Sequence, residues 1–270
     1  MATLNKIHEA EEPSALSEIS LGLKRSVLAV QNYAALSLRS LTNIFTPPHY
    51  MSDTLDQMDI IGVGSLPIVL LTGFFIGAVM VLQTASQFER FGQTSLTGDL
   101  VAIALVRELG PSITALLVAG RNASGMASEL GSMTVTEQVD AMRAMGTDPT
   151  RKLVTPRVVA TVLTLPLLTA LADLIGLVGG FIVSHFQLRL DPVEYWSRAV
   201  DALEFGDLVQ GFTKPIIFGL IVATVGCYQG LSVRGGTQGV GRATTEAVVI
   251  SSVFILITNF FITRIMLFIF

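Results

Sequence analysis

Charged residues stand inside long apolar stretches of this chain, where an ionisable side chain is costly unless it is paired or faces water. Arg107, Glu108 and Arg121 fall in one such stretch, and Asp173 falls in another. Within a membrane, such residues are candidates for holding a charged group or relaying an ion. Two plainer interpretations stay open. Arg107 and Glu108 can mark the end of a span that begins near Leu109, and Asp173 can hydrogen-bond within a helix bundle, which we expect more than a polar route.

The sequence lacks the common motifs of nucleotide hydrolysis, zinc proteases and serine hydrolases. It has no Walker A motif, no HExxH and no GxSxG. His8, His49 and His185 are far apart, and Cys227 is the single cysteine, which excludes an internal disulfide. The glycine-rich segment 232–242 has no GK[ST] ending, so we interpret it as a tight turn. We therefore expect no catalytic site, no metal site and no cofactor in this chain.

A short helix with clear ends follows the apolar stretch of Arg107. Thr134 and Glu137 have the spacing of a capping box, which predicts a helix start near Val135. Gly146, followed by an Asp-Pro pair, suits the left-handed cap at its end. The helix has about eleven residues and spans roughly 16 Å, too short to cross a bilayer.

The apolar residues of this short helix predict that one side of it docks on another surface. Val135, Val139 and Met142 form a single stripe, whereas Glu137 and Asp140 lie off it. The surface can belong to the same chain or to a separate protein, and periodicity alone favours the same chain.

The composition places the chain among integral membrane proteins. Hydrophobic residues make up 51% of the 270 residues and charged residues only 14%, with no basic block that would suit nucleic acid. We predict an all-α fold with about five transmembrane helices. Pro111 interrupts the second of them, and the third contains Pro166. The five predicted spans cover residues 60–88, 100–128, 158–187, 208–231 and 243–270.

Small residues recur at four-residue spacing in three of these spans. Such GxxxG pairs let two helices approach closely, either within one chain or between two copies. The pairs are Gly73 and Gly77, Gly176 and Gly180, and Gly226 and Gly230.

The N-terminal region and one later segment are not uniformly apolar. Residues 1–13 are polar, lack the pattern of a cleavable signal peptide and are predicted to be disordered. Residues 14–46 predict a long amphipathic helix, lying in the membrane surface or packed on the flank of the bundle. Residues 191–206 contain Trp196, the single tryptophan, and predict an interfacial helix.

Most of the 17 basic residues fall on the cytoplasmic side if the N-terminus is cytoplasmic, and the short helix then lies on the cytoplasmic side too.

Three sequence segments resemble a known family. ELGSMTVTEQVDAMRAMGTDP at 129–149, RELGP at 107–111 and GVGRATTEAVV at 239–249 are similar to the MlaE/YrbE permeases, the membrane subunits of MCE-associated ABC lipid transporters. The resemblance covers the chain from about residue 55 and implies a permease transmembrane domain over 55–270. Glu246 departs from the pattern, because a basic or neutral residue is expected after RATT.

The resemblance implies partners, a compartment and site residues. The partners would be a cytoplasmic ABC ATPase that binds ATP and Mg²⁺, a periplasmic MCE-domain protein, a second copy of this chain and a phospholipid, at the bacterial inner membrane. Lys214 would share the substrate region with Arg107 and Glu108, although a lysine at this depth can also extend to water. The residues implied in coupling to the ATPase are Glu129, Thr134, Glu137, Gln138, Asp140 and Met142.

A different class of protein stays open as an alternative. In an ion-coupled secondary transporter, the embedded charges Arg107, Glu108, Asp173 and Lys214 would form a relay. That class predicts inverted repeats, and the sequence shows no internal repeat. A membrane scaffold that transports nothing is a third class, but it leaves the embedded charges without a purpose.

Overall fold

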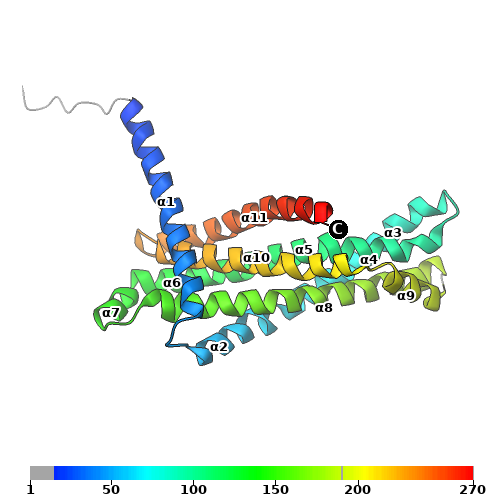
Figure 1. Cartoon of the computed structure of the whole chain (residues 1–270), viewed down its shortest axis with the longest axis horizontal. Helices are drawn as coiled ribbons and strands as arrows, with labels where there is room; N and C mark the ends of the chain where they lie inside the picture. The colour runs from blue at the N-terminus through cyan, green and yellow to red at the C-terminus, as the bar shows by residue number, and fades with distance from the viewer. Residues whose placement is uncertain (1–14, 190, 270) are drawn as a thin grey trace, which may run out of the picture.

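The chain folds into an elongated bundle of helices that lie side by side (Figure 1). The computed structural model describes residues 15–189 and 191–269, and all regular structure in these ranges is helical. The predicted disordered segment 1–13 lies outside them. The helix bounds are α1 (Ala15–Ile44), α2 (Met51–Ile61), α3 (Leu66–Glu89), α4 (Thr97–Ala104), α5 (Gly110–Val118), α6 (Ser124–Val135), α7 (Gln138–Ala144), α8 (Thr155–Leu188), α9 (Pro192–Asp201), α10 (Phe205–Leu231) and α11 (Gly236–Ile269).

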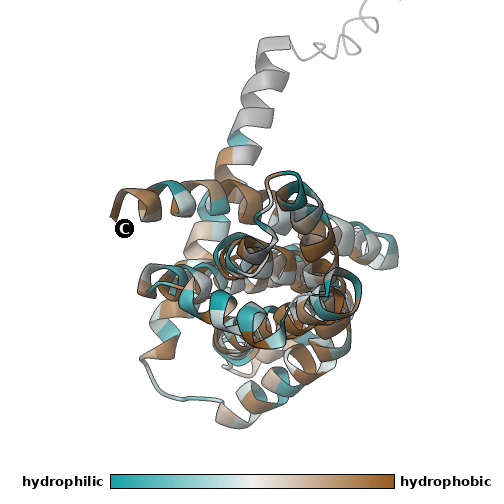
Figure 2. Ribbon diagram, turned by 90° about the vertical axis from the view of Figure 1, so that its right-hand side faces the viewer, coloured by the Kyte–Doolittle hydropathy of each residue, from teal (hydrophilic) through white to brown (hydrophobic). Residues whose placement is uncertain are grey.

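Five segments of the described chain are long and apolar enough to cross a membrane, which confirms the predicted all-α membrane fold. Each is longer than predicted: Met51–Glu89, Thr97–Val135, Thr150–Gln187, Phe205–Leu231 and Gly236–Ile269. The short helix α7 lies at one end of the bundle and α9 at the other (Figure 1). We call these the α7 end and the α9 end. Figure 2 looks along the bundle and shows hydrophobic stretches in its helices, and many large apolar side chains are exposed on the outside of the bundle.

The second span is continuous from Thr97 to Val135, so the expectation that Pro111 interrupts it was wrong. The span contains two π-turns, η3 (Leu105–Leu109) and η4 (Ala119–Ala123). Pro111 follows η3 directly, at the start of α5. A π-turn shifts the hydrogen-bond register by one residue, which accommodates a residue that has no N–H. Pro166 likewise lies inside the continuous helix α8.

The three GxxxG pairs lie at crossings between helices of this chain. In α3, a Cβ atom on Gly77 would overlap the backbone of Gly176 in α8, and one on Gly73 would lie 2.6 Å from the carbonyl oxygen of Ala172. Gly180 faces Gly77 and the hydroxyl of Tyr195. In α10, Gly226 and Gly230 face the second span at Ala123 and Ala127. The interpretation that these surfaces join two copies of the chain therefore needs correction, because the bundle itself occupies them.

The N-terminal helix crosses the bundle near its α7 end and projects beyond it (Figure 1). Two tyrosines anchor it to α10: the Tyr33 hydroxyl lies 2.9 Å from the Thr224 hydroxyl, and the Tyr228 hydroxyl donates to the Ala29 carbonyl at 3.1 Å. At its C-terminal end, Arg151 donates to the carbonyl of Pro47 at 2.8 Å. The helix therefore packs on the flank of the bundle over its second half.

The helix α9 is shorter than the predicted interfacial helix and caps the opposite end. Tyr195 is buried against α8, where its hydroxyl donates to the Leu177 carbonyl at 3.3 Å. Burial raises the pKa of Tyr195 to about 12, so the hydroxyl keeps its proton and remains a donor. In the glycine-rich segment, residues 232–235 connect α10 to α11, and Gly235 and Gly236 have left-handed φ of 89° and 68°. The rest of the segment, 236–242, belongs to α11, which begins at Gly236.

Candidate functional site

The structure brings Arg107, Glu108 and Lys214 together in the half of the bundle near α9. Lys214 is fully buried, and its Nζ donates to Glu108 Oε1 at 2.6 Å and to the carbonyl oxygen of Arg107 at 2.7 Å. In a regular α-helix the donor to the Arg107 carbonyl would be residue 111, a proline without an N–H, and here this carbonyl accepts from Lys214 within the π-turn η3. The RELGP segment therefore supplies both a carboxylate and a backbone carbonyl to one lysine.

Glu108 also connects the second span to α11. Its Oε1 accepts a hydrogen bond from the Thr263 hydroxyl at 2.9 Å, and its Oε2 accepts one from Asn259 Nδ2 at 3.1 Å. The Glu108 side chain nevertheless remains 38% exposed. A carboxylate can accept about four hydrogen bonds, and Glu108 accepts three. It is therefore held in place while part of its surface remains accessible to a ligand.

Arg107 points to a different partner, Asp207 at the start of α10. Its Nε pairs with Asp207 Oδ1, while Asp207 Oδ2 accepts the backbone N–H of Glu204 at 3.0 Å. Asp207 is thus part of a capping box that fixes the first turn of α10. The Arg107 side chain is 34% exposed, and its terminal nitrogens make no hydrogen bond to the described residues. These nitrogens have the fork geometry that suits a phosphate or carboxylate.

We call these six residues the polar cluster: Arg107, Glu108, Asp207, Lys214, Asn259 and Thr263. Its formal charges sum to zero, so it costs less to embed in an apolar bundle than any of its ions alone. It can hold a dipolar or anionic group through Arg107 without a net charge of its own.

Half of the polar cluster was missed from the sequence. Asp207 carries a recognisable signal, the Glu204 to Asp207 spacing of a capping box, but it lay beside a segment interpreted as an interfacial helix. Asn259 and Thr263 are four residues apart, so they share one face of the last span. Polar residues on one face of an apolar helix are the signal that could have identified them.

The residues predicted to couple to an ATPase divide into two groups. Gln138 and Asp140 are exposed on α7, Glu137 is exposed at its N-cap, and Asp140 pairs with Arg143 at 2.7 Å. The other three face the chain itself: Glu129 pairs with the buried Arg157, Thr134 donates to the Leu130 carbonyl, and Met142 packs against the bundle.

The predicted capping box of the short helix was wrong, but its C-terminal cap is confirmed. Thr134 remains inside α6, and Glu137 has a left-handed φ of 60° that separates α6 from α7. The helix therefore starts at Gln138 rather than near Val135. Gly146 has φ of 79° and donates to the Arg143 carbonyl, as a left-handed cap requires. Val139 is buried, so the apolar stripe of α7 docks on its own chain.

We expected Asp173 to hydrogen-bond within the bundle, and the described residues show no such bond. Its side chain is buried, yet its Oδ1 has no hydrogen-bond partner among the described residues. It packs against the backbone of Gly110, at the junction of η3 and α5. The structure therefore leaves one buried acid outside the polar cluster. No group of three His, Cys, Asp or Glu side chains that could hold a metal ion occurs within the described ranges.

Comparison with known proteins gives one consistent result. A family profile described as "Permease MlaE" matches residues 54–265. The chain is 42% identical to a probable ABC transporter permease protein of Rickettsia typhi over 234 residues, 87% of this chain and 90% of that protein. It is 37% identical to the intermembrane phospholipid transport system permease protein MlaE of Haemophilus influenzae over 211 residues, 78% of this chain and 81% of that protein. The chloroplast protein TRIGALACTOSYLDIACYLGLYCEROL 1 of Arabidopsis thaliana is 39% identical over 208 residues, 77% of this chain and 59% of that protein.

Proposed function

The chain belongs to the MlaE permease family and is thus a multi-pass membrane permease of an ABC transporter, and we propose that its cargo is a phospholipid. The lipid would pass between the bacterial inner membrane and an MCE-domain protein on the periplasmic side. The relative from Haemophilus influenzae, whose name specifies intermembrane phospholipid transport, supports this choice of cargo.

The polar cluster is the observation that carries the proposal. A phospholipid presents a phosphate that needs hydrogen-bond donors and acyl chains that need an apolar surface. Arg107 offers partly exposed donors at membrane depth, and the spans around it are apolar. Glu108 and Lys214 hold the segment that carries Arg107 in place, through the side chain of Glu108 and the carbonyl of Arg107. Arg107, Glu108 and Lys214 together form the proposed lipid-binding site.

The energy for transport would come from a cytoplasmic ABC ATPase, which would bind the ATP and Mg²⁺. The exposed side of α7, with Glu137, Gln138 and Asp140, is the proposed contact for it. Basic residues near the α7 end, among them Arg151 and Lys152, favour a cytoplasmic position for that end and for the N-terminus. Because ATPases of this class act as two-fold pairs, the transporter would contain two copies of this chain.

Reconstitution of the complex tests the proposed cargo. The chain is copurified with its ATPase and MCE-domain partners and inserted into vesicles that contain a fluorescent phospholipid. We expect transfer of the lipid to or from the MCE-domain protein only when ATP is hydrolysed. Efficient ATP hydrolysis without lipid transfer, or transfer that proceeds equally without ATP, would contradict the proposal.

Charge reversal on α7 tests the proposed ATPase contact. We expect the double variant Glu137→Lys and Asp140→Lys to lower copurification of the ATPase roughly tenfold, the effect of losing about 1.4 kcal/mol at an interface. Both side chains are exposed, so unfolding stability should change by less than about 0.5 kcal/mol. The matched control is Glu194→Lys, a charge reversal at an exposed residue of α9 at the other end. Normal ATPase binding by the double variant would remove α7 from the interface.

A further inference from the structure

Asp173 is a buried acid that the polar cluster does not use. The residue is 8% exposed, and its Oδ1 is fully enclosed without a hydrogen-bond partner in the described part of the chain. An ionised carboxylate in an apolar bundle is unfavourable unless a cation accompanies it. The position therefore requires either a proton on the acid or a positive charge beside it.

Residues 15–189 and 191–269 place no such positive charge beside Asp173. The cations at the same level of the bundle are engaged elsewhere: the Nε of Arg107 pairs with Asp207, and Lys214 binds Glu108 and a backbone carbonyl. Three elements face Asp173. The second span presents Gly110, α3 presents Val69, Thr72 and Ile76, and α10 presents Leu208, Gly211 and Phe212. None of these neighbours carries a charge.

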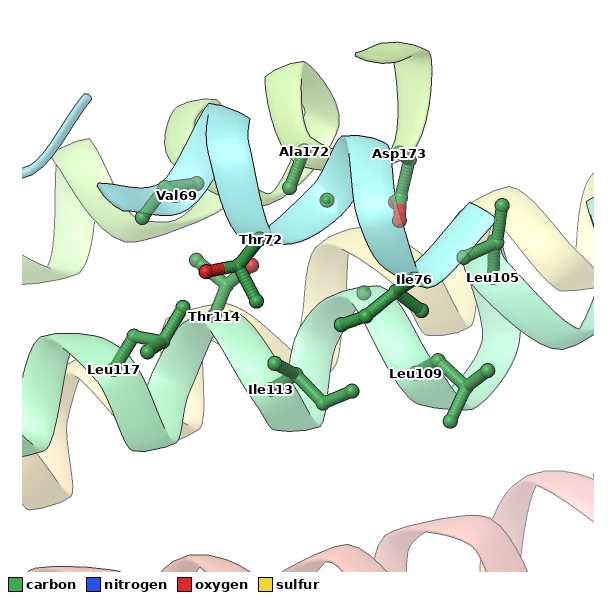
Figure 3. A pocket seen from close by; sticks show the side chains of 12 residues that line it. Val69, Thr72, Ile76, Leu105, Leu109, Ile113, Thr114, Leu117, Ala172 and Asp173 are labelled. Atoms are coloured by element: carbon green, nitrogen blue, oxygen red, sulfur yellow. The ribbon is translucent and has the colours of Figure 1, made fainter. Parts of the chain in front are cut away.

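Two pockets adjoin Asp173, and they differ in size. One lies between α3, α5 and α8 and has a volume of about 10 Å³, room for one water at most (Figure 3). The hydroxyls of Thr72 and Thr114 line it as well. A water there could accept or donate hydrogen bonds, but it could not neutralise a charge. A water in the small pocket therefore cannot compensate the charge of an ionised Asp173.

The larger pocket has a volume of about 190 Å³ and lies between α8, α10 and η3. Its walls are apolar except for Asp173, and three of the wall residues are also exposed on the outer surface: Leu174 at 52%, Leu208 at 44% and Phe212 at 49%. In a membrane this pocket would open sideways to lipid. An aromatic ring beside a carboxylate is a favourable setting for an organic ammonium group.

The larger pocket also adjoins the polar cluster along α10. Gly211 of α10 lines the pocket, and it lies one helical turn after Asp207 and one turn before Lys214, so the pocket and the polar cluster share one face of α10. A single headgroup could therefore meet Arg107 and Asp173 from one side of α10. Arginine suits a phosphate, and a buried carboxylate suits an ammonium.

We propose that the pocket beside Asp173 binds the ammonium group of an amine-bearing phospholipid while Arg107 binds its phosphate. This inference rests on the proposed lipid cargo and narrows it to lipids such as phosphatidylethanolamine, over anionic lipids such as phosphatidylglycerol. The ammonium supplies the positive charge that Asp173 lacks.

A tryptophan placed in the pocket wall tests this preference directly. Phe212→Trp is combined with Trp196→Phe, which removes the native tryptophan, and the full chain is reconstituted in equal amounts of phosphatidylethanolamine and phosphatidylglycerol. Brominated acyl chains, which quench tryptophan fluorescence, are carried by one of the two lipids at a time, so the composition never changes. We expect quenching to report a preference of roughly tenfold for the amine-bearing lipid, as one charge-assisted hydrogen bond would give.

Two matched variants make the result specific. Adding Asp173→Asn, which keeps the shape but not the charge, should remove the preference. Leu163→Trp replaces Phe212→Trp as a control, because Leu163 is an exposed residue of α8 outside the pocket, and it should show equal quenching by both lipids. Equal quenching at Phe212→Trp, or a preference that survives Asp173→Asn, would overturn the inference. If Asp173 is protonated and binds no ammonium group, the two lipids will quench the tryptophan equally at every pH.

The quenching result is independent of the transport assay. If the reconstituted complex transfers lipid but the pocket shows no preference, only this inference fails. If the preference is present and ATP drives no transfer, the proposed function fails while the headgroup site remains. Circular dichroism and size-exclusion profiles of the Asp173→Asn variant confirm that any loss of preference does not arise from unfolding.

Discussion

Replacing Glu108 by leucine is expected to destabilise the protein more than replacing Lys214 by methionine, although both changes break the same ion pair. Lys214 has no exposed surface, so without Glu108 its charge stays buried with only the Arg107 carbonyl as acceptor. The cost of such an uncompensated charge is about 3–5 kcal/mol. Without Lys214, Glu108 keeps its bonds to Asn259 and Thr263 and its 38% exposed surface, so we expect a smaller loss.

The double variant Glu108→Leu and Lys214→Met separates stability from function. Removing both charges should restore most of the stability lost by Glu108→Leu alone, because neither ion is left unpaired. Lipid transfer should remain lost in all three variants if this pair is needed for the cargo. Thermal unfolding in detergent and the reconstituted transfer assay measure the two effects.

A matched control for these charge losses is available at the α7 end of the bundle. Arg242→Met removes a cation that is 82% exposed, and this should leave both unfolding and transfer close to wild type. The outcome that contradicts our interpretation is a double variant that is stable and transfers lipid normally. In that case the pair would serve neither folding nor transport.

The outline of the candidate site could be predicted from the sequence, because a charge in an apolar span is conspicuous at any position. Depth made Arg107 and Glu108 candidates, with the end of a span as the open alternative, and the family resemblance favoured their role in the site and added Lys214. The pairing could not be predicted, since it depends on how three spans rotate about their axes. Pro111 illustrates this: the sequence pattern suggests a break, whereas the structure has a continuous span with a π-turn in which the Arg107 carbonyl accepts from Lys214.

At the short helix α7, a local sequence motif gave the wrong start because tertiary packing sets where the helix begins. Thr134 and Glu137 match a capping box, but the hydroxyl of Thr134 bonds to the Leu130 carbonyl and lies 3.4 Å from that of Gly230 in α10. Packing against α10 keeps Thr134 helical, and the chain breaks at Glu137 instead. The C-terminal glycine was predictable because a left-handed residue requires no tertiary partner.

Replacing Gly77 by alanine is expected to disrupt the crossing of α3 and α8, the most extensive helix pair in the bundle. The new methyl group would overlap the carbonyl oxygen of Gly176, which belongs to the backbone and cannot rotate away. Overpacking of this kind costs about 1–3 kcal/mol, and more when a backbone must move. We expect a lower unfolding temperature in detergent and a smaller folded yield.

The sign of the effect distinguishes close packing from helix propensity. At Gly125 in α6 the same substitution meets no atom within 4 Å, so Gly125→Ala should gain about 0.5–1 kcal/mol from helix propensity. One chemical change should therefore lower stability at the crossing and raise it at the open position. Because Gly77 faces Gly176 and Gly180 of the same chain, this loss should appear even in protein held as a single copy per micelle. A Gly77→Ala variant that keeps its unfolding temperature would show that α3 and α8 do not approach as closely as described.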